Sequence, residues 1–248
     1  MNNLNLKNIT ENLLNTFLHA GEVAKETSSR GVKITIKEDK SPVTDGDLAV
    51  NKILCEEISK ITPNISIISE ETVNITTKNK NENFWLIDPI DGTRDYIKKR
   101  DEYTLNAALI IKLEPVIGIV YAPQKNRLFF SYGKDLAFEI RDGKKSILNC
   151  KKEHKDKTIA LINSDTTPNE VLDLYKKYKV SEIVKMSSSL KFCTLAAGEA
   201  DIYAAKARAF EWDIAAGHAI LEHAGGSVTT FEEKKFLYGK KNYKNLSI

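Results

Sequence analysis

The chain has 248 residues, 42% of them hydrophobic and 29% charged, which is enough to bury a substantial core in one compact unit. Its 37 basic and 34 acidic residues give a net charge of +3, too balanced for a nucleic-acid surface, and no apolar run approaches the roughly 20 residues of a membrane span. The sequence start lacks a signal peptide and the three cysteines form no C-x-x-C pair, so we expect a cytoplasmic protein with reduced thiols and no nucleic-acid partner. The oligomeric state stays open.

The first sixty residues predict two amphipathic helices. Apolar residues recur at helical spacing from Ile9 to about Ala24, and again from about Gly46 to Ile61. Thr62-Pro63-Asn64 ends the second helix. Between the helices lie a break at Gly31 and a short β-like stretch, Val32 to Ile36.

Strand-like sequences follow. Ile65–Ile68 and Phe84–Ile87 are apolar and short, and the second ends where Pro89 removes a ladder donor. The mostly polar stretch Thr72 to Asn83 predicts a loop between them. An antiparallel meander is expected over Leu105–Ile111, Val116–Tyr121, Leu128–Tyr132 and Leu136–Ile140.

The last third alternates between strands and helices, which predicts an α/β layer. A charged connector, Lys151 to Lys157, precedes it and marks the expected lobe boundary, with residues 1–152 on one side and 153–248 on the other. The expected strands are Ile159–Ile162, Ile183–Met186 and Ile202–Ala205, and the expected helices are Pro168–Tyr178, Ser189–Ala197 and Ile214–His223.

The segment FWLIDPIDGTRDY carries two carboxylates, Asp88 and Asp91, directly after an apolar strand. Two anionic side chains this close repel each other unless a cation lies between them. With the carbonyl of Ile90 they form an all-oxygen ligand set suited to Mg²⁺. Gly92 lets the backbone approach a ligand closely, and Thr93 adds a hydroxyl where a helix N-terminus could face a phosphate.

Three further carboxylates are candidates for the same site. Glu70 follows the strand Ile65–Ile68, just as Asp88 follows its own strand, and two strand ends can meet at one sheet edge. Asp45 and Asp213 each stand at a helix start, where helix capping is the more common role. Taken singly, each residue is explained by capping or by a solvated surface.

Three motifs stand in order along the chain: Ser69-Glu70-Glu71, Trp85–Tyr96 and Trp212–Gly226. Together they resemble the inositol monophosphatase family of Mg²⁺-dependent, lithium-sensitive phosphatases. Four further phrases are Lys40–Thr44, Tyr121–Pro123, Ser188–Cys193 and Ala215–His218. With these phrases the chain looks most like the bacterial 3'(2'),5'-bisphosphate nucleotidases of the CysQ type, which act in sulfur assimilation. The resemblance implies an α+β or α/β fold, a layered αβαβα sandwich with an N-terminal antiparallel-sheet lobe and a C-terminal α/β lobe.

The resemblance also implies roles for individual residues. Glu70, Asp88 and the Ile90 carbonyl would hold a first Mg²⁺. A second would lie on Asp88, Asp91 and Asp213, with Glu70 helping a third. Thr93 and Asp45 would orient and deprotonate the attacking water. The expected catalytic residues are Asp45, Glu70 and Thr93, and the expected substrate-binding residues are Asp91, Gly92, Thr93, Ser188, Lys191 and Asp213.

The expected reaction is hydrolysis of the 3'-phosphate of adenosine 3',5'-bisphosphate, a small-molecule phosphate ester, to AMP. In the nucleotidases that the chain resembles, an Arg stands two residues after a Tyr; here Tyr203 is followed by Ala204 and Ala205, so Lys206 or Arg208 would have to replace it. Inositol phosphate and fructose bisphosphate therefore stay open as substrates. A haloacid dehalogenase-type phosphatase is a weaker alternative because its D-x-D-G-T spacing differs, and a non-catalytic binding protein would be expected to lack ligands.

Overall fold

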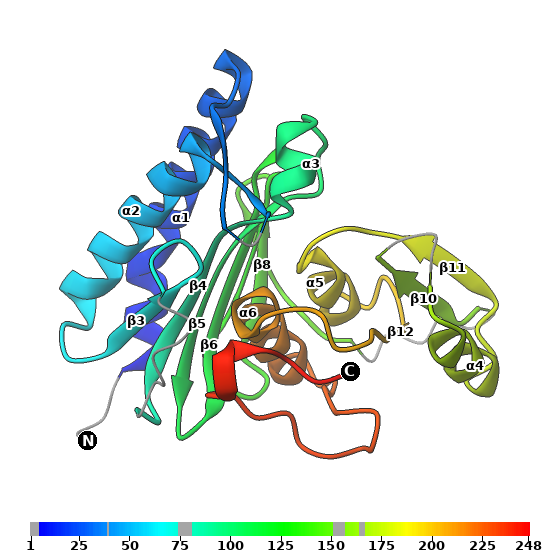
Figure 1. Ribbon diagram of the computed structural model, residues 1–248. Helices are drawn as coiled ribbons and strands as arrows, with labels where there is room; N and C mark the ends of the chain where they lie inside the picture. Colours follow the sequence, from blue (N-terminus) through cyan, green and yellow to red (C-terminus); the bar gives the residue numbers. More distant parts are fainter. Residues whose placement is uncertain (1–4, 39, 74–80, 151–156, 164–166) are drawn as a thin grey trace.

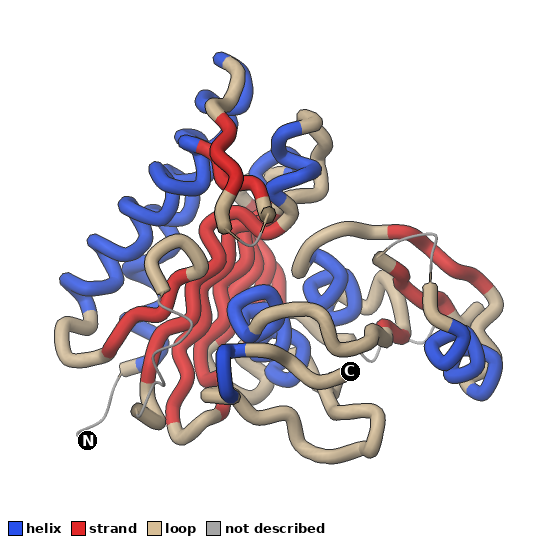
Figure 2. The backbone as a smooth tube through the Cα atoms, in the orientation of Figure 1, coloured by secondary structure: helices blue, strands red, loops and turns tan. Residues whose placement is uncertain are grey.

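The computed structural model describes residues 5–38, 40–73, 81–150, 157–163 and 167–248. Its elements form five layers: two long helices, a seven-stranded sheet, two shorter helices, a three-stranded sheet and an outer helix (Figures 1 and 2). This is the layered αβαβα sandwich expected from the sequence, and the prediction is confirmed. No helix among the described residues is both long and apolar enough to cross a bilayer.

The first layer consists of α1 (Leu6–Arg30) and α2 (Asp45–Ile61). Their apolar stripes pack on the central sheet, with Phe17 and Leu54 fully buried. The α2 N-terminus is fixed by a capping box in which the Thr44 hydroxyl accepts from the Asp47 amide. Between the helices a short hairpin pairs β1 (Ile34–Ile36) with β2 (Pro42–Thr44); β2 was not predicted from the sequence.

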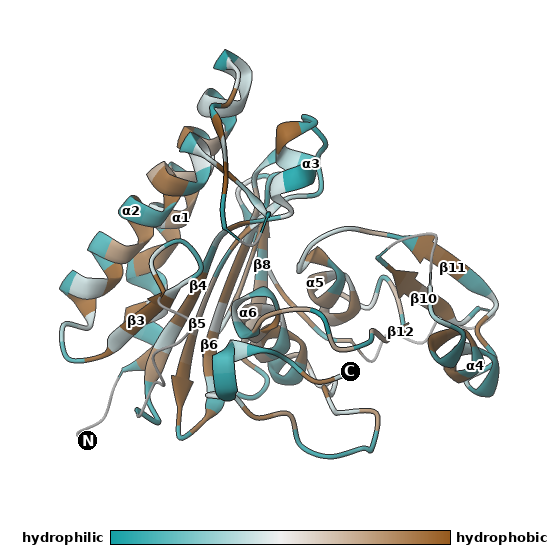
Figure 3. Ribbon diagram, viewed as in Figure 1, coloured by the Kyte–Doolittle hydropathy of each residue, from teal (hydrophilic) through white to brown (hydrophobic). Residues whose placement is uncertain are grey.

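The central sheet has the order β3-β4-β5-β6-β7-β8-β9. Only β3 and β4 are parallel; the other pairs are antiparallel, which confirms the predicted meander. The edge strand β9 was missed because its residues are all exposed and lack an apolar alternation. Strands of the sheet are strongly hydrophobic in Figure 3. The bounds are β3 Ser66–Ser69, β4 Phe84–Asp91, β5 Thr104–Ile111, β6 Glu114–Ala122, β7 Arg127–Ser131, β8 Ala137–Arg141 and β9 Lys144–Ile147.

The third layer, α5 (Leu190–Ala196) and α6 (Glu211–His223), covers the other face of the sheet. Helix α6 approaches β6 so closely that a Cβ on Gly118 would lie 2.2 Å from the carbonyl oxygen of Ala216. Gly118 is therefore required for this close approach. The contact fixes the position of the α6 N-terminus relative to the sheet.

The outer layers contain the parallel sheet β11-β10-β12 and helix α4 (Asn169–Lys177), which lie beyond α5 in Figure 1. They share a small core that includes Val171 and Tyr175. The strands are β10 Ile159–Ile162, β11 Glu182–Lys185 and β12 Ile202–Tyr203. The short helices of the chain are α3 Thr93–Ile97 and two 3₁₀ turns, η1 Pro123–Lys125 and η2 Lys241–Tyr243.

The predicted lobe boundary between residues 152 and 153 falls outside the described residues, as does part of the predicted loop Thr72 to Asn83. The seven-stranded sheet ends at Ile147 and the three-stranded sheet begins at Ile159. Both sides nevertheless share one core, in which Phe84 and Phe129 of the large sheet pack with Trp212 of α6. The division into 1–152 and 153–248 stays a prediction.

Candidate active site

The parallel pairing of β3 and β4 brings their carboxyl ends to the same sheet edge. Ser69 is in register with Ile87, and the Glu70 amide donates to the Ile87 carbonyl at 3.1 Å. Glu70 and Asp88, the next residues along the two strands, therefore come together. The sequence predicted this meeting of strand ends.

The strand β4 does not end at Pro89, contrary to the sequence prediction. It continues to Asp91 across an irregularity in its pairing with β5, where Asp88 pairs with Asn106 and Asp91 with Thr104. Pro89 lies in the irregular part, where a missing ladder donor is tolerated. The register of β4 with β5 therefore shifts between Asp88 and Asp91.

Asp213 reaches the site from the first turn of α6. Its carboxylate accepts from the Phe210 amide at 2.8 Å, so it also caps the helix as expected for an acidic residue in this position. Capping uses only one of its oxygens. The other is free to face the sheet edge, to which the close approach at Gly118 directs the helix.

Glu70, Asp88 and Asp213 form a cluster in which one oxygen of each lies within 4.8 Å of the others. Burial, with the neighbouring Glu70 and Asp91 charges, raises the pKa of Asp88 well above its usual range. Burial and the same kind of repulsion raise the pKa of Asp213 as well. Asp88 Oδ1 is buried without a hydrogen-bond partner among the described residues. A partly buried, oxygen-only cluster with an unsatisfied acceptor fits a hard divalent cation such as Mg²⁺.

Asp91 and the Ile90 carbonyl complete the predicted ligand set. The Asp91 carboxylate accepts from the Ser189 amide at 2.5 Å. Burial raises the pKa of Asp91, whereas the nearby Lys191 charge and the Ser189 amide lower it. The Ile90 carbonyl accepts from the Thr93 hydroxyl at 3.1 Å. Both groups lie beside the Glu70, Asp88 and Asp213 cluster.

Thr93 has a different carboxylate partner from the predicted one. Its hydroxyl lies 3.2 Å from Asp47 Oδ1. Asp45, the predicted partner, instead accepts from the Lys33 amide at 2.9 Å, on the outer side of the helix start. The structure therefore brings Thr93 together with Asp47 and not with Asp45.

The Asp47 side chain is 1% exposed, and burial raises its pKa to about 6. Its second oxygen accepts from the Thr44 amide at 2.8 Å and from the Thr44 hydroxyl at 2.5 Å. The sequence did carry a signal for this arrangement, because T-x-x-D matches a capping box with Asp47 at its third helical position. That signal was overlooked in favour of the adjacent Asp45.

Lys37, in the turn between β1 and β2, was also not predicted to belong here. Its ammonium lies 3.3 Å from Glu70 and 2.9 Å from Glu71. Burial lowers the pKa of Lys37, but Glu70 and Glu71 outweigh this and raise it overall. The Lys37 ammonium therefore ties the hairpin to the sheet edge that carries Glu70.

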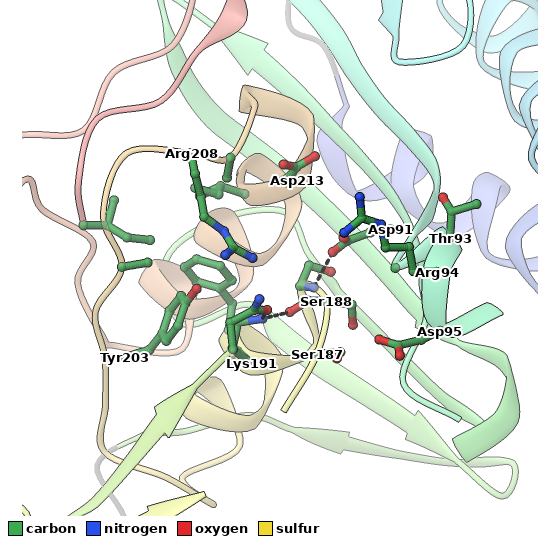
Figure 4. Close-up of a pocket in the computed structure, with 18 of the residues that line it drawn as sticks. Asp91, Thr93, Arg94, Asp95, Ser187, Ser188, Lys191, Tyr203, Arg208 and Asp213 are labelled. Carbon is green, nitrogen blue, oxygen red and sulfur yellow. Dashed lines mark hydrogen bonds between the residues drawn. The ribbon is translucent and has the colours of Figure 1, made fainter. Parts of the chain in front are cut away.

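A cavity of about 520 Å³ opens beside these carboxylates (Figure 4). The predicted substrate residues Gly92, Ser188 and Lys191 line it, together with the carboxylates of Glu70, Asp91 and Asp213. Lys191, an expected substrate-binding residue, is only 4% exposed, and burial lowers its pKa to about 8. The cavity thus joins an acidic wall to a basic one.

Ser189 connects α5 to the sheet edge that carries the carboxylates. Its hydroxyl lies 2.6 Å from Asn106 Oδ1 and 2.9 Å from the Thr104 hydroxyl, and it does not cap α5. Its amide holds Asp91 at the same time. The segment that carries Lys191 and the strand that carries the acidic residues are therefore positioned together.

A model of the inositol monophosphatase family matches residues 5–245. A curated 3'(2'),5'-bisphosphate nucleotidase CysQ from Buchnera aphidicola is 39% identical over 206 residues, which cover 82% of this chain and 77% of the relative. The crystal structure of CysQ from Bacteroides thetaiotaomicron has a TM-score of 0.78 at 28% identity and covers 98% of this chain and 96% of its own. A structure described as an IMPase/NADP phosphatase complexed with Mg²⁺ and phosphate shares the fold, with a TM-score of 0.77 at 19% identity over 98% of this chain and 90% of that one.

Proposed function

The chain belongs to the inositol monophosphatase family, and from this premise we propose that it is a Mg²⁺-dependent phosphatase that converts adenosine 3',5'-bisphosphate to AMP and phosphate. Phosphate-monoester hydrolysis is the activity of the curated nucleotidases that it resembles. The choice of the 3'-phosphate as the group removed follows the nucleotidase relatives. Metal dependence follows the family and the carboxylate cluster.

The observation that carries the proposal is the convergence of Glu70, Asp88 and Asp213 from three separate elements. Asp88 is buried and Glu70 and Asp213 are partly buried, and burial raises the pKa of all three, so their ionised forms destabilise the fold unless a cation balances their charge. Glu70, Asp88, Asp91, Asp213 and the Ile90 carbonyl would hold two or three Mg²⁺ ions. When bound, such ions lower the pKa of water and neutralise charge on the phosphoryl oxygens and the leaving group.

The protein groups around the cluster supply the proton transfer and the orientation. The Thr93 hydroxyl lies within reach of two acceptors, Asp47 Oδ1 and the Ile90 carbonyl. With its single proton turned towards Asp47 rather than Ile90, its oxygen can accept from the attacking water. Asp47, with a pKa of about 6, is ionised at neutral pH and takes the proton. The raised pKa makes it a stronger base than a solvated aspartate. We therefore assign Asp47, in place of Asp45, to the role of general base.

The substrate phosphate that is removed would lie against the acidic wall, beside Gly92 and the N-terminus of α3. Gly92 has a φ of +92°, and its carbonyl accepts hydrogen bonds from the Asp95 and Tyr96 amides, which form the first turn of the helix. The left-handed conformation favours glycine at this position. Lys191, on the opposite wall, binds the part of the substrate that is not hydrolysed.

A haloacid dehalogenase-type mechanism is not supported. In this chain β4, which carries Asp88, pairs parallel with β3 on one side and antiparallel with β5 on the other, within a largely antiparallel sheet. The matched family is a different one. A non-catalytic binding protein is also disfavoured, because every predicted acidic ligand is present and three of them converge.

The proposal is tested by phosphate release from purified protein with adenosine 3',5'-bisphosphate, inositol 1-phosphate and fructose 1,6-bisphosphate, with and without Mg²⁺. We expect Mg²⁺-dependent release, fastest from the nucleotide. A preference for inositol 1-phosphate or for fructose 1,6-bisphosphate would overturn the proposed substrate but leave the phosphatase activity in place. No release of phosphate from any of these esters in saturating Mg²⁺ would refute the proposal that the protein is a phosphatase.

A further inference from the structure

One of the basic side chains that line the cavity, that of Arg208, has no hydrogen-bond or ion-pair partner among the described residues. Arg208 lies in the segment between β12 and α6 and lines the cavity. No hydrogen bond or ion pair joins its guanidinium to any residue of the described ranges. Figure 4 shows the side chain pointing into the cavity, on the same side as Lys191 and Tyr203. An exposed arginine is ordinarily unremarkable, but this one faces a second cation.

The second cation, Lys191, is buried at the floor of the cavity. Its ammonium donates to the Ser188 carbonyl at 2.5 Å and to Asn163 Oδ1 at 3.2 Å, both of them neutral acceptors. Burial lowers the pKa of Lys191 most, and the positive charge of Arg208 lowers it further, while Asp91 raises it. The two cations are thus close enough to repel each other. The Asp91 carboxylate offsets part of this repulsion, but it forms no ion pair with either cation among the described residues.

Two converging cations with neutral partners are stabilised by an anion placed between them. The acidic wall supplies no direct partner for them, because Glu70, Asp88 and Asp213 cluster together and the Asp91 carboxylate is held by the Ser189 amide. A phosphate fits the requirement, since a guanidinium can bind it through two parallel hydrogen bonds and an ammonium adds a point charge.

We propose that Arg208 and Lys191 together bind the second phosphate of the substrate. Arg208 is then the residue by which the protein discriminates a bisphosphate from a monoester. This rests on the proposed function, because it needs one phosphate to lie on the acidic wall. The cavity then binds the two phosphates by opposite chemistry, the first through cations held by carboxylates and the second directly through side-chain cations. Tyr203, whose ring lies 5.2 Å from the Lys191 ammonium, lies beside the second phosphate.

Lys206, the other candidate from the sequence, also lines the cavity, but its ammonium is paired outside it. Its ammonium forms an ion pair with Glu170 of α4 at 3.1 Å and lies 5.7 Å from the Phe231 ring. The pair is exposed and weak, but it draws the side chain towards the outer layers. Lys206 therefore provides a matched control, a neighbouring cation on the same segment that should not contribute.

The test compares Arg208→Gln with Lys206→Gln. For each variant kcat/KM is measured in saturating Mg²⁺ with adenosine 3',5'-bisphosphate and with adenosine 3'-monophosphate, which lacks the second phosphate. The affinity for AMP, whose only phosphate is the second one, is measured by titration calorimetry. An unchanged rate with the monophosphate shows that each variant is folded.

We expect Arg208→Gln to lower kcat/KM for the bisphosphate, and to weaken AMP binding, by about 10- to 100-fold, as for loss of one charge-assisted phosphate contact. The monophosphate rate should change by less than about threefold, and Lys206→Gln should resemble the wild type throughout. Equal losses on both substrates, or unchanged AMP binding, would overturn the assignment of Arg208 and leave the phosphatase in place. A wild-type protein that does not prefer the bisphosphate would overturn both this inference and the nucleotidase proposal.

Discussion

The structure replaces Asp45, the aspartate predicted to act with Thr93, by Asp47. A comparison of the variants Asp47→Asn and Asp45→Asn tests which of the two is the base. In the wild type, Asp47 Oδ2 accepts two hydrogen bonds from Thr44, and Oδ1 faces the Thr93 hydroxyl at 3.2 Å. An asparagine keeps its oxygen towards Thr44, because its amide nitrogen cannot accept from the Thr44 amide. Its amino group then faces Thr93 and cannot take a proton.

Asp47→Asn should therefore preserve the helix cap and lose the base. General-base catalysis contributes about 10²- to 10⁴-fold, so kcat should fall by that factor, equivalent to about 2.7–5.4 kcal/mol. Asp45→Asn retains an oxygen for the Lys33 amide and should change kcat by less than about threefold. Steady-state phosphate release measures both variants, with circular dichroism to verify folding. A large loss in Asp45→Asn, or near-wild-type turnover in Asp47→Asn, would refute the reassignment.

Four further predictions follow from the same geometry. Asp91→Asn should lower turnover by orders of magnitude and reduce the thermal stabilisation that Mg²⁺ gives, as measured by differential scanning fluorimetry, because the variant removes a ligand charge. Thr93→Ala should lower kcat more than it raises KM, since the hydroxyl acts on the nucleophile; the opposite split in steady-state kinetics would contradict this role. The ammonium of Lys191, with a pKa of about 8, loses its charge as pH rises, so calorimetry should show AMP binding weakening between pH 7 and pH 9 in the wild type but less in Lys191→Arg. Gly118→Ala should lower the free energy of unfolding by about 1–3 kcal/mol in urea titration and also reduce activity, because the added methyl pushes α6 and Asp213 away from the sheet.

Much of the fold and of the acidic site was predictable from the sequence. Apolar runs of strand length followed at once by Glu70 and Asp88 predicted that two strand ends meet, and the parallel pairing of β3 with β4 brings this about. The alternating last third likewise predicted a second, smaller sheet. These features depend on local sequence, which periodicity reports directly.

The remaining features depend on orientation and on tertiary contacts. Asp45 and Asp47 lie about 200° apart around a helix, so only one of them can face the sheet, and sequence spacing alone did not decide which. Pro89 was expected to end β4, but the bulge accommodates it. Burial of Lys191 arises from packing between α5 and neighbouring elements that are distant in sequence, which no local pattern reveals.

The most direct test of the central claim is the rate of Mg²⁺-dependent phosphate release from adenosine 3',5'-bisphosphate compared with inositol 1-phosphate. The account predicts AMP and phosphate as products, with kcat/KM for the nucleotide at least about tenfold higher, as expected when a second phosphate contributes one charge-assisted contact. Equal or faster hydrolysis of inositol 1-phosphate, or release that does not depend on Mg²⁺, would contradict it.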